Sequence, residues 1–92
     1  MRKEVAFKNR DRFIQLGIAI SSLRRLRGLS QEKLAEKANI SRSLLSVIEA
    51  PNTACSFSLE SLYDIADALD VTAADLINAS LFSDSIINKT SE

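Results

Sequence analysis

The sequence contains no histidine, one cysteine, one proline and two glycines. Without histidine, and with a single thiol, the chain lacks the His and Cys ligand sets that transition-metal sites use. Two isolated glycines exclude a glycine-rich phosphate-binding loop, and no group of catalytic residue types stands together. The composition therefore predicts a protein that is not an enzyme, with no metal, no cofactor and no small-molecule substrate.

The sequence also lacks any apolar run that approaches the length of a membrane span. Glu4 and Asp11 interrupt the start too early for a signal peptide, and Cys55 has no second cysteine with which to form a disulfide. We therefore expect a cytoplasmic protein that does not enter a membrane. A length of 92 residues, 46% of them hydrophobic, allows one globular domain with a modest core.

A net charge of one sign is absent as well, because 12 basic residues balance 12 acidic ones. The two signs are nevertheless separated along the chain. Residues 1–42 hold 11 Lys and Arg against 4 acids, whereas residues 43–92 hold one Lys against 8 acids. Helical proteins also segregate charge by accident, but a strongly basic half produces a local field that attracts a polyanion.

The stretch from Ser30 to Glu49 predicts two short helices joined by a sharp turn. Ser30 is a suitable N-cap for the first helix, whose apolar positions Leu34, Ala35 and Ala38 recur at helical spacing. Asn39 tolerates the left-handed conformation that ends a helix, and Ile40 is expected to pack beneath the turn. Ser41 then caps a second helix that runs to about Ala50.

At about 100° per residue, the second helix has two clearly different sides. The side expected to face the core consists of Ser41, Leu44, Leu45 and Ile48. The opposite side is small and hydroxylated, with one long cationic side chain, and consists of Arg42, Ser43, Ser46, Val47 and Ala50. Short side chains with one guanidinium suit a helix lying in a DNA major groove. The pattern is that of a helix-turn-helix, and it predicts Arg42, Ser43, Ser46 and Val47 as base-contacting residues, with Arg42 on a guanine.

About two thirds of the chain resembles the Cro/phage-repressor-like (Xre) family of helix-turn-helix regulators. The matching segments are Leu16-Gly17, Ile20, Leu23-Arg24, Gly28 to Glu32, Leu34-Ala35, Asn39 to Ser43, Ile48-Glu49, Ser58 to Leu62, Ile65-Ala66, Ala68-Leu69, Val71-Thr72 and Asp75-Leu76. The resemblance implies an all-α, five-helix lambda-repressor-like domain that binds operator DNA. It also implies an ion pair between Arg24 and Glu49 that fixes the second motif helix.

Five polar residues near the motif are predicted to hold DNA phosphates: Gln31, Ser41, Arg25, Arg27 and Lys33. Gln31 stands at the start of the first motif helix, where free backbone N–H groups favour anions, and the family resemblance supports this role. Cations at the end of the first helix, such as Arg25 and Arg27, also simply favour a helix C-terminus.

The other helices follow from apolar spacing and cap residues. The first spans about 11–27 and ends at Gly28, with a buried stripe of Ile14 (or Phe13), Leu16, Ala19, Ile20, Leu23 and Leu26. The fourth spans about 58–69, with Leu59, Leu62, Ile65, Ala66 and Leu69 buried, and the fifth begins at Thr72. Before them, the basic residues 1–10 form a flexible segment or an arm along DNA.

Between Ala50 and Phe57 the sequence departs from the family, because the loop carries no positive charge. We divide the chain into the flexible basic segment 1–10, the DNA-binding domain 11–81 and a C-terminal tail 82–92. Large apolar residues near the end predict a homodimer contact through Ile77, Leu81, Phe82, Ile86 and Ile87. The predicted partners are double-stranded DNA and a second copy of the chain. Two alternatives remain, namely an antitoxin that has a toxin as partner and a helical protein-interaction module without DNA binding.

Overall fold

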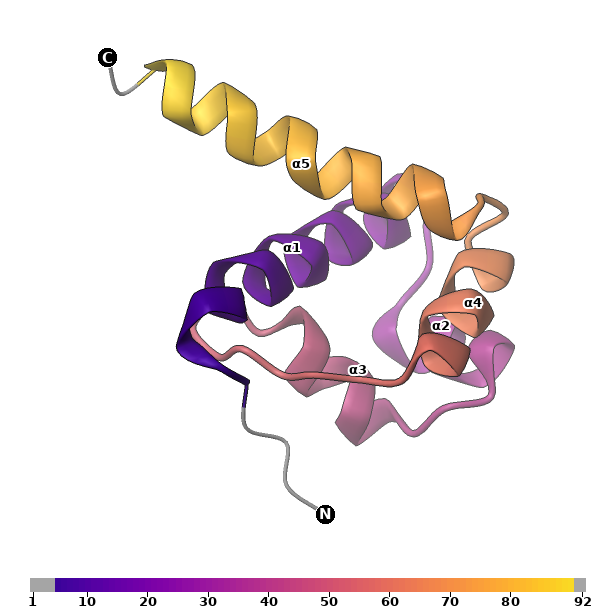
Figure 1. Cartoon of the computed structure of the whole chain (residues 1–92). Coiled ribbons are helices and arrows are strands. Elements are labelled where there is room, and N and C mark those ends of the chain that lie inside the picture. The colour runs from indigo at the N-terminus through magenta and orange to yellow at the C-terminus, as the bar shows by residue number, and fades with distance from the viewer. Residues whose placement is uncertain (1–4, 91–92) are drawn as a thin grey trace.

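The computed structural model describes residues 5–90, and side chains from residue 5 to residue 81. Within this range the chain is helical and has no strand (Figure 1). A 3-10 turn, η1 (Phe7–Asn9), leads into five α-helices: α1 (Arg10–Leu26), α2 (Gln31–Ala38), α3 (Arg42–Glu49), α4 (Leu59–Ala68) and α5 (Ala73–Thr90). The predicted all-α class with five helices is confirmed.

The predicted cap residues begin four of these helices. The hydroxyls of Ser30, Ser41 and Ser58 each accept a hydrogen bond at 3.0 Å from the backbone N–H three residues later. At the start of α5, Thr72 Oγ1 accepts from the Asp75 N–H at 3.0 Å, and Asp75 Oδ2 accepts from the Thr72 N–H at 3.1 Å. These caps satisfy backbone donors that a helix leaves open, and so they fix where each helix starts.

Three turns depend on a left-handed backbone, at Gly28, at Asn39 and, after α4, at Asp70 with φ of 62°. Asn39 ends α2 with φ of 57°, as predicted, and Gly28 follows α1 with φ of 72°. Asn is one of the few non-glycine residues that adopts this conformation readily, which allows the chain to reverse between α2 and α3. The sharp reversal brings both motif helices onto the same bundle.

The core is continuous across all five helices. Its fully buried large side chains are Ile20, Leu34, Leu45, Ile65, Leu69 and Leu76. Three predictions of burial are wrong, because Leu26 is 81% exposed, Leu59 is 62% exposed, and Ser41, expected on the core side of the second motif helix, is exposed. Leu26 is the last residue of α1 and Leu59 the first of α4, where neighbouring helices no longer cover the side chain.

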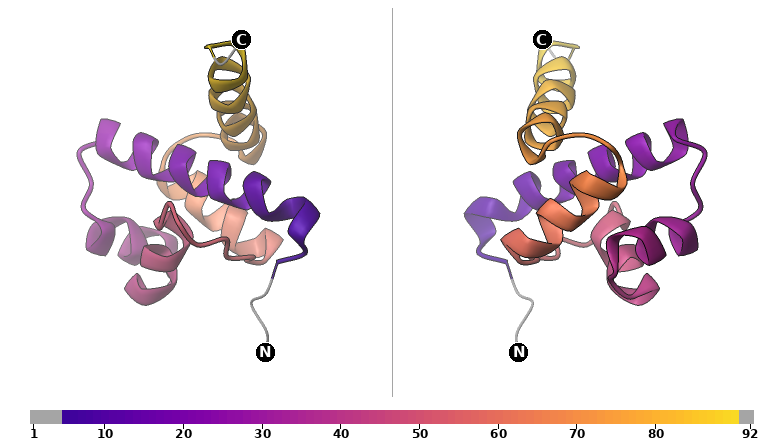
Figure 2. Two further views of the ribbon diagram at one scale, coloured as in Figure 1. Left: turned by 90° about the vertical axis from the view of Figure 1, so that its left-hand side faces the viewer. Right: turned by 90° about the vertical axis from the view of Figure 1, so that its right-hand side faces the viewer.

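Helix α1 lies at the centre of the arrangement, with α5 on one side and α3 on the other (Figure 1). Helix α2 packs against α3 and α4. The side views show α5 standing out from the rest of the bundle (Figure 2). The predicted boundary at residue 81 lies within α5, because no glycine or proline interrupts the helix before Thr90.

Candidate nucleic-acid interface

Helix α3 presents the outward face that its sequence predicts. Arg42, Ser43 and Ser46 are exposed and line one shallow depression, and Val47 beside them is 41% exposed. On the opposite side of the helix, Leu45 and Ile48 are buried. We call the four outward residues the α3 face. Its orientation is confirmed, whereas contact with bases stays a prediction.

A glycine sets how closely α3 approaches α1. A Cβ atom added at Gly17 would lie 2.0 Å from the backbone oxygen of Ile48 and 3.1 Å from its carbonyl carbon. No side chain fits in that space, so the two backbones touch directly at the end of α3. This contact sets the distance between α1 and the end of α3.

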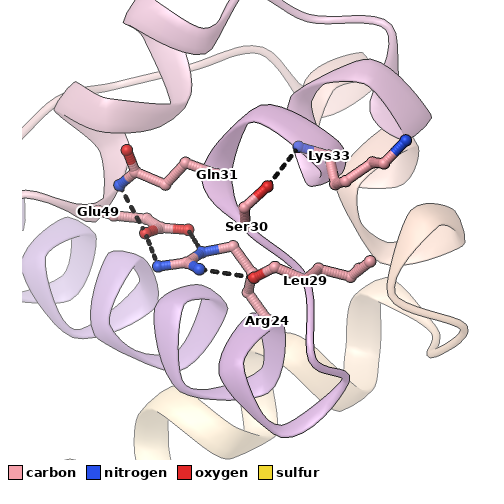
Figure 3. Close-up of polar contacts among 6 residues, drawn as sticks. All are labelled: Arg24, Leu29, Ser30, Gln31, Lys33 and Glu49. Carbon is pink, nitrogen blue, oxygen red and sulfur yellow. Dashed lines mark hydrogen bonds and ion pairs between the residues drawn. The ribbon is translucent and has the colours of Figure 1, made fainter.

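A buried ion pair fixes the same end of α3 (Figure 3). Arg24 donates from Nε to Glu49 Oε2 at 2.9 Å and from Nη2 to Glu49 Oε1 at 3.0 Å. Its Nη1 donates to the Leu29 carbonyl at 2.7 Å. The side chains of Arg24 and Glu49 are only 10% and 3% exposed. The predicted pair is therefore present as a two-point contact, which fixes geometry better than a single bond.

Gln31 extends this ion pair to α2. Its amide nitrogen donates to Glu49 Oε1 at 3.0 Å (Figure 3). One of its two N–H groups is therefore used inside the protein, and only the other could donate to a phosphate as predicted. Glu49 thus ties the end of α3 to α1 through Arg24 and to the start of α2 through Gln31.

The remaining predicted phosphate residues lie in different surroundings. Arg25 is exposed near the end of α1, and Arg27 donates from Nε to the Leu69 carbonyl at 2.9 Å, which ties α1 to the end of α4. Lys33 is exposed, with its Nζ 3.5 Å from Glu36. The Ser41 oxygen accepts from the Leu44 N–H, which leaves its own hydroxyl proton to donate.

The loop after α3 is held to the start of α1. Ala50 has an extended backbone, as expected before a proline, and Pro51 and Asn52 are exposed. Further along, the Phe57 ring meets the Phe13 ring edge-on, with centroids 5.8 Å apart. Phe57 is also partly buried against the core, so it anchors the end of the loop.

The chain matches the family described as "Helix-turn-helix domain" over residues 17–80. The chain belongs to the Cro/phage-repressor-like (Xre) family. No curated protein sequence gives a significant match to this Xre-family chain.

Among solved structures, this Xre-family chain is similar to several regulators. The restriction-modification controller protein C.AhdI from Aeromonas hydrophila is 31% identical, with a TM-score of 0.65, over 70% of this chain and 94% of that one. The clp gene regulator ClgR from Corynebacterium glutamicum is 27% identical, with a TM-score of 0.75, over 88% and 83% of the two chains. SinR, a master regulator for biofilm formation solved in complex with DNA, is 34% identical, with a TM-score of 0.62, over 67% and 97%.

The predicted dimer residues of the Xre-family chain fall in two groups. Ile77 and Leu81 are 43% and 58% exposed on α5. Phe82, Ile86 and Ile87 follow in the same helix, and their side chains lie outside the described residues. Ile77 and Leu81 border a groove between α1 and α5, which Asp11, Arg12, Gln15, Leu16 and Ser80 complete.

Sequence reasoning missed three contacts of this Xre-family domain: the close approach at Gly17, the bond from Gln31 to Glu49, and the bond from Arg27 to Leu69. Gly17 had a usable signal, because an isolated glycine inside a helical pattern indicates close packing. The two hydrogen bonds join residues far apart in the chain, and no sequence signal pointed to them. Within the described residues, no group of His, Cys, Asp and Glu side chains could hold a metal, and no helix is long and apolar enough to cross a membrane.

Proposed function

We propose that the protein is a sequence-specific transcriptional regulator that binds operator DNA as a homodimer and reads it with α3. The observation that carries this proposal is the α3 face, which is exposed over its whole length while its other side is buried in the bundle. Membership of the Xre family and similarity to SinR, which was solved with DNA, support a DNA partner.

The base contacts are assigned to the α3 face. Arg42 is the first residue of α3 and the only charged member of the face, so it can reach two acceptors of a guanine in the major groove. Ser43 and Ser46 offer short hydroxyls, and Val47 offers a methyl surface suited to the thymine methyl group. Because three of these side chains are short, the helix backbone can lie close to the base edges.

The phosphate contacts are assigned to residues at the end of α1, in the first turn of α2 and at the cap of α3. Ser41 and Gln31 each keep an N–H or O–H donor that the described bonds do not use, and both stand at helix starts, where the dipole favours anions. Arg25, Lys33 and Arg27 supply positive charge, with the Nη groups of Arg27 available beside its bond to α4. These contacts would set the register of α3 without selecting a sequence.

The groove between α1 and α5 is the proposed dimer contact. Ile77 and Leu81 expose apolar surface there, and Asp11 and Arg12 stand at the same groove with opposite charges. A two-fold interface brings each patch onto its own copy, so Asp11 of one subunit can pair with Arg12 of its partner. A dimer formed in this way would present two copies of α3 to half-sites about one DNA turn, ~34 Å, apart.

We propose further that the regulator acts as a repressor, because a dimer that covers operator DNA at a promoter excludes other proteins from the same stretch. A reporter gene under the selected operator tests this step directly. Expression should fall when the protein is present and recover in the Arg42→Ala variant. A rise in expression would assign activation instead.

The test of the proposed function is selection of bound sequences from a random DNA pool, followed by a salt titration of the selected site. A palindromic site whose affinity falls steeply with salt is expected. Arg42→Ala should weaken binding by ~1–3 kcal/mol and relax the preference at one base position per half-site. Absence of DNA binding at low salt would overturn the proposal in favour of a protein-interaction module.

A further inference from the structure

The loop that follows α3 lies directly after the α3 face and carries no positive charge. Residues 50–57 contain no Lys or Arg, although Pro51, Asn52 and Thr53 are exposed directly after the α3 face. A phosphate backbone that passes this end of α3 meets no cation from the loop itself. Any electrostatic contact there has to come from another segment.

The start of α1 is the segment beside this loop. The edge-on contact of Phe13 with Phe57 joins the first turns of α1 to the end of the loop. In Figure 1, η1 leaves the start of α1 toward the side of α3 and away from α5. The basic beginning of the described chain and the uncharged loop therefore lie next to each other.

Lys8 and Arg10 are exposed cations of this segment. Arg10 precedes Gly17 by seven residues, which places the two about 20° apart around the helix. Since Gly17 faces the backbone of Ile48, Arg10 lies two turns earlier on the side of α1 that faces α3. Lys8 is exposed in η1, just ahead of it.

The position of these cations is not explained by helix stability. Arg10 is the first residue of α1, where the helix dipole disfavours positive charge. Lys8 precedes it by two residues, so both stand at the positive end of the dipole. A cation at such a place is better explained by an anion outside the helix.

We infer that Lys8 and Arg10 form a phosphate-binding pair that supplies the charge missing from the loop after α3. The inference rests on the proposed DNA binding and adds to it a contact site at the start of α1. Because phosphates carry no sequence information, the pair positions α3 on the duplex and does not select bases. Its removal should weaken all DNA sequences alike.

The experiment measures DNA affinity against salt concentration for the selected operator and for an unrelated duplex. Lys8→Gln and Arg10→Gln should each lower the slope of log affinity against log salt by ~0.9, and the double variant by ~1.8. The matched control is Lys37→Gln, which removes the same charge beside Asp67 of α4 and Asp70 of the turn that follows α4. Thermal unfolding of each variant checks that the fold is retained.

A second pair of variants separates charge from side-chain shape. Lys8→Arg and Arg10→Lys keep both charges and should keep the full salt slope. The inference is overturned if the double glutamine variant keeps the parent slope, or if Lys37→Gln lowers the slope as much as Arg10→Gln does. If the parent protein binds neither duplex, the proposed function fails instead, and the two failures are thereby distinguished.

Discussion

The two sides of α1 differ in how completely the chain covers them. On the α3 side, the Gly17 backbone touches Ile48 and the buried Arg24–Glu49 pair closes the contact. On the α5 side, Ile77 and Leu81 stay partly exposed along an open groove. The first side is complete within one chain and positions the α3 face. The second has the surface that a partner would cover.

This difference corresponds to two requirements of the proposed function, DNA binding as a dimer. The orientation of α3 relative to its own bundle has to be rigid, because base contacts tolerate displacements of only about 0.5 Å. The spacing between two copies of α3 depends instead on the contact between subunits. Variants on the two sides of α1 should therefore change different measurements.

We call the α3 side of α1 the closed side and the α5 side the open side. The largest effect is expected for Arg24→Ala, on the closed side. Loss of the guanidinium leaves the Glu49 carboxylate buried with only Gln31 as a partner, and the Leu29 carbonyl loses its donor. Removing one partner of a buried ion pair costs ~3–5 kcal/mol of unfolding free energy. Chemical denaturation measures this loss.

A double replacement serves as the control for Arg24→Ala. When both Arg24 and Glu49 are replaced by Met, no uncompensated charge remains, so the loss should be smaller than for Arg24→Ala alone. A double variant that loses as much as the two single variants together would show that the pair is not coupled. The closed side would then owe its stability to packing.

The next largest effect is expected for Gly17→Ala. The added methyl group meets the Ile48 backbone oxygen, and since that atom cannot rotate away, α1 and α3 have to separate. Overpacking of this kind costs ~1–3 kcal/mol or more. Denaturation should show the loss, and DNA affinity of the folded fraction should fall because α3 has moved.

Gly28→Ala is the matched comparison for Gly17→Ala. A Cβ atom at Gly28 would meet nothing within 4 Å, although the φ of 72° strains an alanine at this position. This variant should lose some stability through the backbone yet leave DNA affinity of the folded protein unchanged. If both variants weaken DNA binding equally, the close approach at Gly17 does not position α3.

Sequence predicted the helices and their caps better than the contacts between helices, for physical reasons. Apolar spacing and caps are local, so the sequence locates α2, α3 and the caps at Ser30 and Ser41 correctly. The Arg24–Glu49 pair followed from the family resemblance, because the two residues lie 25 positions apart and no local rule joins them. The exposed Leu26 and Leu59 were misjudged because helical spacing does not tell where a helix passes beyond its neighbours.

A smaller effect on stability is expected for Leu81→Asp, on the open side. Leu81 is 58% exposed, so the substitution should change the unfolding free energy of the monomer by about 0.5 kcal/mol or less. In a two-fold interface the new carboxylate would occur twice, and dimerisation should fail. Sedimentation measures the oligomeric state, and binding to the full operator should weaken more than binding to a half-site. A variant that remains dimeric would place the interface elsewhere.

A small effect of the opposite sign is expected for Gln15→Leu, in the same groove. Gln15 Oε1 is buried and has no hydrogen-bond partner among the described residues. In a monomer, replacing this acceptor by a similar apolar side chain should raise the unfolding free energy by up to ~1 kcal/mol, because a buried oxygen without a donor is costly. Because this oxygen has no exposed surface in the single chain, a partner subunit cannot reach it, and dimerisation should not alter the gain. Chemical denaturation should therefore show an equal rise in the parent protein and in the Leu81→Asp background, and a fall in both would show that the oxygen has a donor.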